Sequence, residues 1–205
     1  MSATASSLYH SSHNDCRGDS RIARQIAMNL PNRKSPRLKG YDYNKNGAYF
    51  ITLCTDGRRL LLSEITGLTP SDIKLSLTPY GKIVEQVIEI LPKEFGISLD
   101  AYVIMPNHIH LLFMMLQQTE NHILTEKRSY LSKIVGYLKM NVTKEIHRIN
   151  QNEIVWQRSY HDKIVRDEKQ YLRIWNYIHE NPLVWQFDCY HPEQNDIRSE
   201  TAGDS

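Results

Sequence analysis

The sequence has no uninterrupted run of about 18 apolar residues, so no membrane-spanning helix and no membrane partner are expected. The first 30 residues lack the apolar stretch of a secretory leader, so secretion is not expected either. Cysteine is scarce, and Cys16, Cys54 and Cys189 match neither a disulfide framework nor a CxxC zinc motif, which favours a reducing cytoplasm. Glycine-rich phosphate loops and dinucleotide fingerprints are also missing, which argues against the common nucleotide-binding folds.

The formal net charge is only +2, but the charges are unevenly distributed along the chain. Residues 1–46 hold eight Lys or Arg against three acids, and residues 126–148 hold six against two. Residues 186–205, in contrast, hold one basic residue against five acids. Two basic segments suggest a polyanionic partner, although solvated faces and a solubilising tail would give the same distribution.

The order of predicted elements indicates one α+β domain with a mainly antiparallel sheet and helices packed on it, because regular βαβ alternation is missing. Strands are predicted at 48–55, 60–65, 97–105 and 108–115, helices from Thr78-Pro79 and over about 126–149, an extended segment or strand at 155–165, and a last helix from Asp167 to Pro182. The Ser-rich residues 1–32 are predicted to be a disordered arm, residues 33–190 the domain, and 191–205 a flexible acidic tail.

His108 and His110 are the first candidate site residues. In a strand, residues i and i+2 share a face, so the two imidazoles lie side by side while Ile109 points into the core. Neutral imidazole is a common metal ligand, and such a pair at a solvent-open sheet edge would leave coordination positions free for a phosphate oxygen. A hydrogen-bonded surface pair would show the same spacing, so the pattern alone does not decide.

Tyr177 lies at the border of the apolar face of the last predicted helix, where a phenol can reach a site while its ring packs. A tyrosine that attacks a phosphodiester keeps the bond energy in a phosphotyrosine linkage, so a strand can be cut and rejoined. Tyr160 and Tyr171 are rivals that spacing does not exclude. Asn181, one helical turn after Tyr177, is either a third metal ligand or a helix terminator before Pro182.

Three segments together resemble the REP-associated tyrosine transposases and related single-tyrosine transposases of the HUH endonuclease group. They are RLKGYDYNKNGAYFITLCTDGR (37–58), LDAYVIMPNHIHLLF (99–113) and VWQRSYHDKIVRDEKQYLRIWNYIHENPLVW (155–185). The resemblance implies a ferredoxin-like fold around a central antiparallel sheet and cleavage of single-stranded DNA, often beside a hairpin, with Mg²⁺ or Mn²⁺. It matches His108 and His110 to the metal ligands and Tyr177 to the nucleophile, and Asn181 more weakly to a third ligand.

Several expectations follow from this resemblance and from the basic segments. Phosphates of a folded single strand are expected to meet Arg33, Lys34, Arg37, Lys39, Lys133 and Lys139, with Tyr41 and Tyr43 stacking on unpaired bases. The protein is expected in the cytoplasm at the nucleoid, as a monomer or homodimer in which the tyrosine serves its own or the partner subunit. The alternatives are a domesticated protein that binds DNA hairpins without cutting, a metal-dependent hydrolase that uses water, and a purely structural domain.

Overall fold

The computed structural model describes residues 42–67, 69, 71–116, 129–188, 190 and 191. The strands are β1 (Gly47–Cys54), β2 (Ser63–Thr66), β3 (Lys74–Leu77), β4 (Ile97–Ile104), β5 (His108–Met115) and β6 (His161–Val165). The α-helices are α2 (Pro79–Phe95), α3 (Tyr130–His147) and α4 (Glu168–Glu180), and η1 (Asp56–Arg58) and η3 (Asn181–Phe187) are short 3₁₀ segments.

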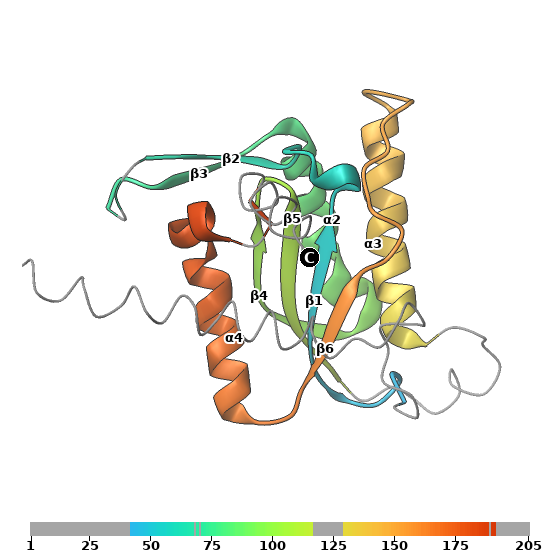
Figure 1. The fold of residues 1–205 in the computed structure, drawn as a ribbon. Coiled ribbons are helices and arrows are strands. Elements are labelled where there is room, and N and C mark those ends of the chain that lie inside the picture. Colours follow the sequence, from blue (N-terminus) through green and yellow to red (C-terminus); the bar gives the residue numbers. More distant parts are fainter. Residues whose placement is uncertain (1–41, 68, 70, 117–128, 189, 192–205) are drawn as a thin grey trace, which may run out of the picture. The chain divides into compact units, whose positions relative to one another are not determined.

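In the described part of the chain, four strands form one antiparallel sheet in the order β4-β5-β1-β6 (Figure 1). β1 and β5 are central, and β1 pairs with β5 from Gly47↔Met115 to Cys54↔His108. β2 and β3 form a separate hairpin. This order and the α2 and α3 crossovers are those of a ferredoxin-like α+β fold, which confirms the expected fold class.

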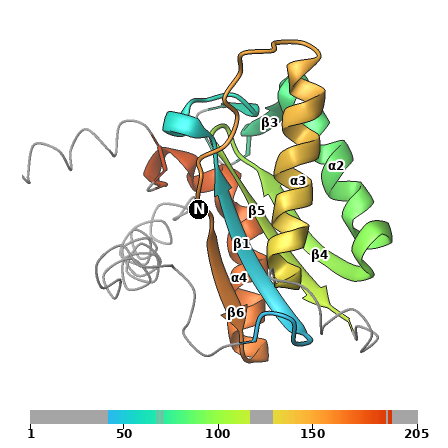
Figure 2. The ribbon, with the colours of Figure 1, turned by 90° about the vertical axis from the view of Figure 1, so that its right-hand side faces the viewer.

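Helices α2 and α3 cover one face of the sheet, and α4 covers the other (Figure 2). The larger core lies under α2 and α3, where apolar residues recur at helical spacing. From the sheet it takes alternate residues such as Ile51 and Leu53 of β1 and Ile109 of β5. The prediction that Ile109 points into the core is therefore confirmed.

A smaller core under α4 consists of Ala101, Leu112, Ile174 and Ile178. Ala101 reaches this face because a register irregularity in β4, between Leu99 and Ala101, changes the alternation of side chains. Helical spacing predicts an apolar face of α4 made of Tyr171, Ile174, Trp175 and Ile178, but Trp175 is 38% exposed, so the buried face is narrower than that spacing indicates.

The ends of the helices follow local sequence signals. Thr78 caps α2 by accepting a hydrogen bond from the Gly81 amide at 3.1 Å, and Asp167 caps α4 by accepting one from the Gln170 amide at 2.7 Å. α2 ends at Gly96, whose φ of 56° is in the left-handed region that glycine adopts without strain. The predicted cap at Asp167 is thus confirmed.

Three predictions of local structure need correction. The hairpin partner β3 was not predicted, because its four residues are too few to show a clear alternation. In the segment 155–165 only His161–Val165 is a strand. Pro182 does not push Asn181 out of the helical region: Asn181 has φ −54° and ψ −44°, and the chain continues into η3, where proline fits the first turn.

Described residues beyond Trp185 belong to a separate unit. In it, the His191 amide donates to the Asp188 carbonyl at 2.9 Å and the Tyr190 amide donates to Asp188 Oδ1 at 2.7 Å. The predicted arm (1–32) and residues 192–205 of the predicted tail lie outside the described residues. None of the described helices is long and apolar enough to cross a bilayer.

The start of α2 is linked by backbone hydrogen bonds, through Leu61 and Leu62, to the loop that precedes β5. The Leu61 and Leu62 amides both donate to the Pro106 carbonyl at 2.9 Å, and the Thr78 amide donates to the Leu62 carbonyl at 3.0 Å. A Cβ on Gly81 would come within 1.9 Å of the Leu62 carbonyl oxygen, so only glycine allows this approach.

Gly81→Ala is expected to lower the free energy of unfolding by about 1–3 kcal/mol, because backbone must move to admit the methyl group. Gly136→Ala is the matched control, since a Cβ there meets nothing within 4 Å. At this exposed position in α3, alanine is expected to raise the free energy of unfolding by about 0.5–1 kcal/mol. Urea unfolding measures both, and equal stability of Gly81→Ala and wild type would contradict the close approach.

Candidate active site

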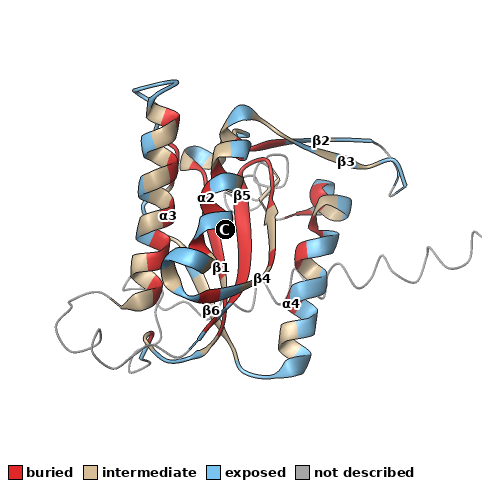
Figure 3. Cartoon of the chain, turned by 180° about the vertical axis from the view of Figure 1, so that it is seen from behind, coloured by how far each residue is buried: buried red, intermediate tan, exposed pale blue. Residues whose placement is uncertain are grey.

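His108 and His110 lie at the start of β5 on the face that α4 covers. Their exposed fractions are 0% and 1%, and β5 is a central strand (Figure 3). The expectation of a solvent-open sheet edge is therefore wrong, because β1 and β4 flank β5 on both sides. The interpretation as a surface pair is excluded as well. Their Nε2 atoms are 3.1 Å apart, so the two rings point at one another.

Each imidazole is oriented by a hydrogen bond at Nδ1. Asn107 Oδ1 lies 2.9 Å from His108 Nδ1, while Asn107 Nδ2 donates to the Arg58 carbonyl at 3.3 Å. The amide thus presents its oxygen to His108, which donates from Nδ1 and keeps an electron pair on Nε2. Thr52 Oγ1 lies 2.8 Å from His110 Nδ1, and a hydroxyl can donate or accept there.

Both imidazoles are held neutral. Burial, the neighbouring His110 and the charge of Arg58 keep the pKa of His108 well below 6.5. Burial lowers the pKa of His110 to about 3. Neutral imidazoles with available Nε2 electron pairs are the form that binds metal ions.

Tyr177 comes to this pair from α4, with its phenol oxygen 3.3 Å from His110 Nε2. The helix sets this position because Ile174 and Ile178, on either side of Tyr177 in sequence, are buried against the sheet. The contact joins α4 and β5 of one chain.

Two further aromatic rings enclose the site. Phe50 of β1 lies 5.1 Å from the His110 ring and 6.3 Å from the Tyr177 ring, measured between centroids. Trp185 of η3 lies 6.0 Å from the His108 ring. These rings exclude water from the histidine pair, which strengthens electrostatic interactions there.

Asn181 is fully buried, and neither of its side-chain atoms has a hydrogen-bond partner among the described residues. Its position lies one helical turn beyond Tyr177, which contacts His110, and one turn before Trp185, which contacts His108. A buried amide without a partner costs free energy, so a ligand for it is expected. Asn181 is also the C-cap of α4, so it ends this helix while its side chain is buried.

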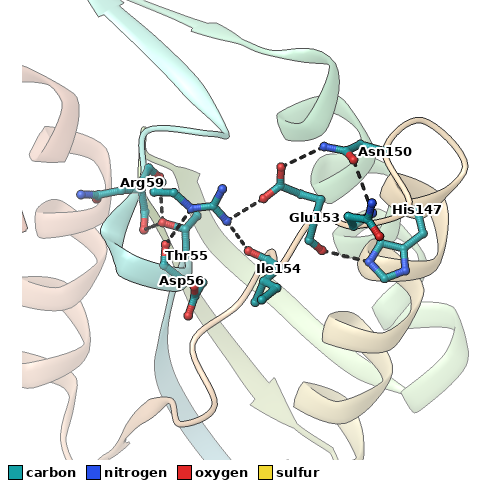
Figure 4. A network of polar contacts seen from close by, with 9 residues as sticks. Thr55, Asp56, Arg59, His147, Asn150, Glu153 and Ile154 are labelled. Atoms are coloured by element: carbon teal, nitrogen blue, oxygen red, sulfur yellow. Dashed lines mark hydrogen bonds and ion pairs between the residues drawn. The ribbon is translucent and has the colours of Figure 1, made fainter.

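The turn after β1 is linked to the site through the Arg58 carbonyl, which accepts the hydrogen bond from Asn107. Arg58 has a φ of 55°, the one positive φ of a non-glycine residue in the described ranges, and such backbone strain persists only where the surroundings hold it. The Arg58 amide donates to the Thr55 carbonyl at 3.1 Å, and the next residue, Arg59, pairs with Glu153 Oε1 at 2.6 Å and donates to the Ile154 carbonyl (Figure 4). This network ties the turn to the chain beyond α3.

The rival tyrosines lie elsewhere. Tyr160 packs against the core under α2 and α3. Burial and a hydrogen bond with Asp100 raise the pKa of Tyr171, which makes its phenol a poorer nucleophile.

Of the predicted DNA-contacting residues, those that the structure describes lie away from this site. Arg33, Lys34, Arg37, Lys39 and Tyr41 lie outside the described residues. Lys133 and Lys139 are on α3, which covers the opposite face of the sheet, and Lys139 Nζ donates to the carbonyls of Gln157, Arg158 and Ser159. Tyr43 is buried in the core, so its expected stacking on bases is wrong.

Sequence reasoning missed Thr52, Asn107, Phe50 and Trp185 as parts of the site. Asn107 could have been found as the polar neighbour of His108. The others depend on strand register and on the course of η3, which single-sequence patterns do not reveal.

Within the described ranges there is no cluster of three His, Cys, Asp or Glu that could hold a metal ion. The candidate donors are instead the two imidazole nitrogens and the buried amide of Asn181. An amide oxygen suits Mg²⁺ and Mn²⁺, so the chemistry of the donors fits a weakly held divalent ion completed by water or phosphate oxygens.

The fold and the site together define an α+β protein with a buried histidine pair and a tyrosine helix. The sequence pattern of the family described as transposase, IS200-like, matches residues 74–181, which include both histidines, Tyr177 and Asn181. The chain belongs to the IS200-like transposase family, and its role is that of a DNA transposase.

The chain is similar to several known proteins. A Haemophilus influenzae protein described as uncharacterized is 34% identical over 172 residues, covering 78% of this chain and 93% of its own. A second H. influenzae protein, provisionally named a REP-associated tyrosine transposase, is 25% identical over 178 residues, 78% of this chain and 86% of its own. A solved structure of a REP-associated tyrosine transposase bound to a REP hairpin has 18% identity, covers 74% of this chain and 75% of its own, and gives a TM-score of 0.49.

The buried histidines predict a loss of stability in acid. In the unfolded chain each imidazole takes up a proton near pH 6.5, whereas the pKa of both is lowered in the folded chain. Below that pH the unfolded state binds more protons, so the free energy of unfolding falls as the pH falls, by up to about 1.4 kcal/mol per pH unit for each imidazole. Urea unfolding with a chelator present, from neutral pH to about pH 4, measures the slope over the range in which the unfolded imidazole charges.

In the double variant His108→Gln/His110→Gln, the free energy of unfolding is expected to fall less steeply with falling pH, because the contribution of the two buried imidazoles is gone. His179→Gln, which changes an exposed histidine of α4, is the control and is expected to keep the slope of the wild type. Equal slopes for the wild type and the double variant would show that the two histidines do not resist protonation.

Proposed function

We propose that this transposase cleaves single-stranded DNA, beside a hairpin, through a covalent bond between Tyr177 and a 5′ phosphate, with a divalent metal ion. The single observation that carries the proposal is that the Tyr177 phenol oxygen lies 3.3 Å from His110 Nε2 in an otherwise enclosed site. Family membership supplies the DNA substrate class.

The reaction is a transesterification. The Tyr177 oxygen forms a bond to the scissile phosphorus, the bond from phosphorus to the 3′ oxygen breaks, and that oxygen leaves with the electron pair and takes up a proton as a 3′ hydroxyl. The phenol proton goes to solvent. A 3′ hydroxyl of another strand reverses the chemistry and releases the tyrosine, so no bond energy is lost.

His108, His110 and Asn181 would hold the ion. When bound, Mg²⁺ or Mn²⁺ supplies charge stabilisation for the scissile phosphate and for a phenol whose ordinary pKa is about 10. The protein's own contribution is preorganisation. Asn107 fixes the His108 electron pair on Nε2, and the Thr52 hydroxyl can accept from His110 Nδ1, which frees the second Nε2.

Tyr177→Phe is expected to abolish the covalent protein–DNA adduct, since the variant lacks the attacking oxygen but keeps the ring. The assay incubates the protein with Mg²⁺ and a 5′-labelled or 3′-labelled hairpin-flanked oligonucleotide and separates adducts by denaturing electrophoresis. Tyr171→Phe is the control and should still form the adduct. An undiminished adduct with Tyr177→Phe would contradict the assignment. Cleavage without any adduct would favour a water-using hydrolase, and binding without cleavage would favour the non-cutting hairpin binder.

The metal set is tested by titrating Mn²⁺ into the DNA-free protein and measuring calorimetric heat or water-proton relaxation. Asn181→Ala and Thr52→Val are expected to weaken binding about 10–100-fold, as loss of a weak ligand or a supporting partner does elsewhere. His108→Ala is expected to abolish it. Asn141→Ala, which removes an amide on α3, is the control. Unchanged Mn²⁺ affinity in Asn181→Ala would exclude Asn181 as a ligand, and unchanged affinity in His108→Ala would overturn the site.

A further inference from the structure

A pair of cations next to Tyr177 has no role in the chemistry above. The first is Lys163 of β6, which pairs with Phe50 of β1 and so shares the α4-facing side of the sheet. The Phe50 ring contacts both the His110 and the Tyr177 rings. Lys163 is therefore one side chain removed from the site, on a strand at the edge of the sheet (Figure 1).

The second cation is Arg173 of α4, which precedes Tyr177 by one helical turn and so lies on the same side of the helix. Its Nε donates to the Lys169 carbonyl at 3.3 Å, and its side chain is exposed. The strand and the helix thus place two interacting positive charges on the α4 side of the sheet.

The two charges act on each other. Burial lowers the pKa of Lys163, and the charge of Arg173 lowers it further, whereas Asp167 opposes this more weakly. The ion pairs of the described residues are Arg59–Glu153 and Arg148–Glu145, and neither includes Lys163 or Arg173. A partly buried lysine beside an exposed arginine of like charge is suited to a bound anion, which would relieve the repulsion between them.

We propose that Lys163 and Arg173 bind a backbone phosphate of the DNA strand next to the phosphate that Tyr177 attacks. This inference rests on the proposed function, and it adds how the strand is held in register with the tyrosine. A guanidinium fork and an ammonium group are the donors that phosphate oxygens prefer. Contacts of this kind carry no base information, so they position the strand whatever its sequence.

The test measures binding of a fluorescein-labelled mixed-sequence single-stranded oligonucleotide by anisotropy at several KCl concentrations. All proteins carry Tyr177→Phe, so cleavage does not interfere. Adding Lys163→Gln and Arg173→Gln is expected to weaken binding about tenfold or more, as loss of charge-assisted hydrogen bonds does. The slope of log affinity against log salt should become shallower by about 0.7 for the one phosphate no longer neutralised.

The matched control replaces Lys82 and Lys93, two exposed lysines of α2 on the opposite face, by Gln. It makes the same change in net charge and is expected to leave the slope unchanged. A charge-preserving pair, Lys163→Arg with Arg173→Lys, is expected to keep the slope as well. Thermal unfolding of the Gln pair should show no loss of stability, because a repulsion has been removed. Should that pair not fold, Arg173→Gln alone, at an exposed position, gives the same comparison.

A slope and affinity like those of the control would overturn the inference, even if the wild type forms the Tyr177 adduct. A slope that falls equally in the Lys82/Lys93 variant would overturn it too, since the effect would then be one of net charge. If the slope falls in the Lys163/Arg173 variant while the wild type forms no adduct, the proposed chemistry fails and the phosphate site stands.

Discussion

The burial of two imidazoles on the central strand β5 is the constraint on which the rest of the site depends. A buried imidazole must be neutral and must have partners, and here Asn107 and Thr52 supply those partners at Nδ1. Their hydrogen bonds turn both Nε2 atoms toward one point, where Tyr177 also arrives. The same two hydrogen bonds therefore give the buried imidazoles their polar partners and bring Nε2 electron pairs close to the Tyr177 oxygen, a potential nucleophile.

The two faces of the sheet differ in how many helix residues are buried against them. α2 and α3 bury five and six residues, whereas α4 buries only Ile174 and Ile178. Elements with few buried contacts open at lower free energy than the core does. The histidine pair lies on the face with the smaller core, and the large core under α2 and α3 holds the strands that carry it.

The sequence was informative wherever a local residue pattern determines the structure. Helical spacing gave α2 and α4, a capping Asp167 gave the start of α4, and the alternation around Ile109 put both histidines on one face. The burial of the histidines was not predictable, because it depends on β5 being a central strand. Strand order is set by long-range pairing, which local patterns do not show. The same reason hides Thr52, which meets His110 only through the register of β1 with β5. The end of α4 before Asn181-Pro182 was predictable from the proline, whereas the 3₁₀ segment η3 that follows was not.

The central claim is that His108 and His110 are neutral and buried, that their Nε2 atoms face one another, and that His110 Nε2 faces Tyr177. Nitrogen-15 NMR of the imidazoles in the metal-free protein at neutral pH tests it most directly, because ring nitrogens with and without a proton have distinct shifts. The account predicts that both rings are neutral, that His108 carries its proton on Nδ1, and that neither ring titrates near pH 6.5. Ordinary titration near that pH, or a proton on Nε2 of His108, would contradict it.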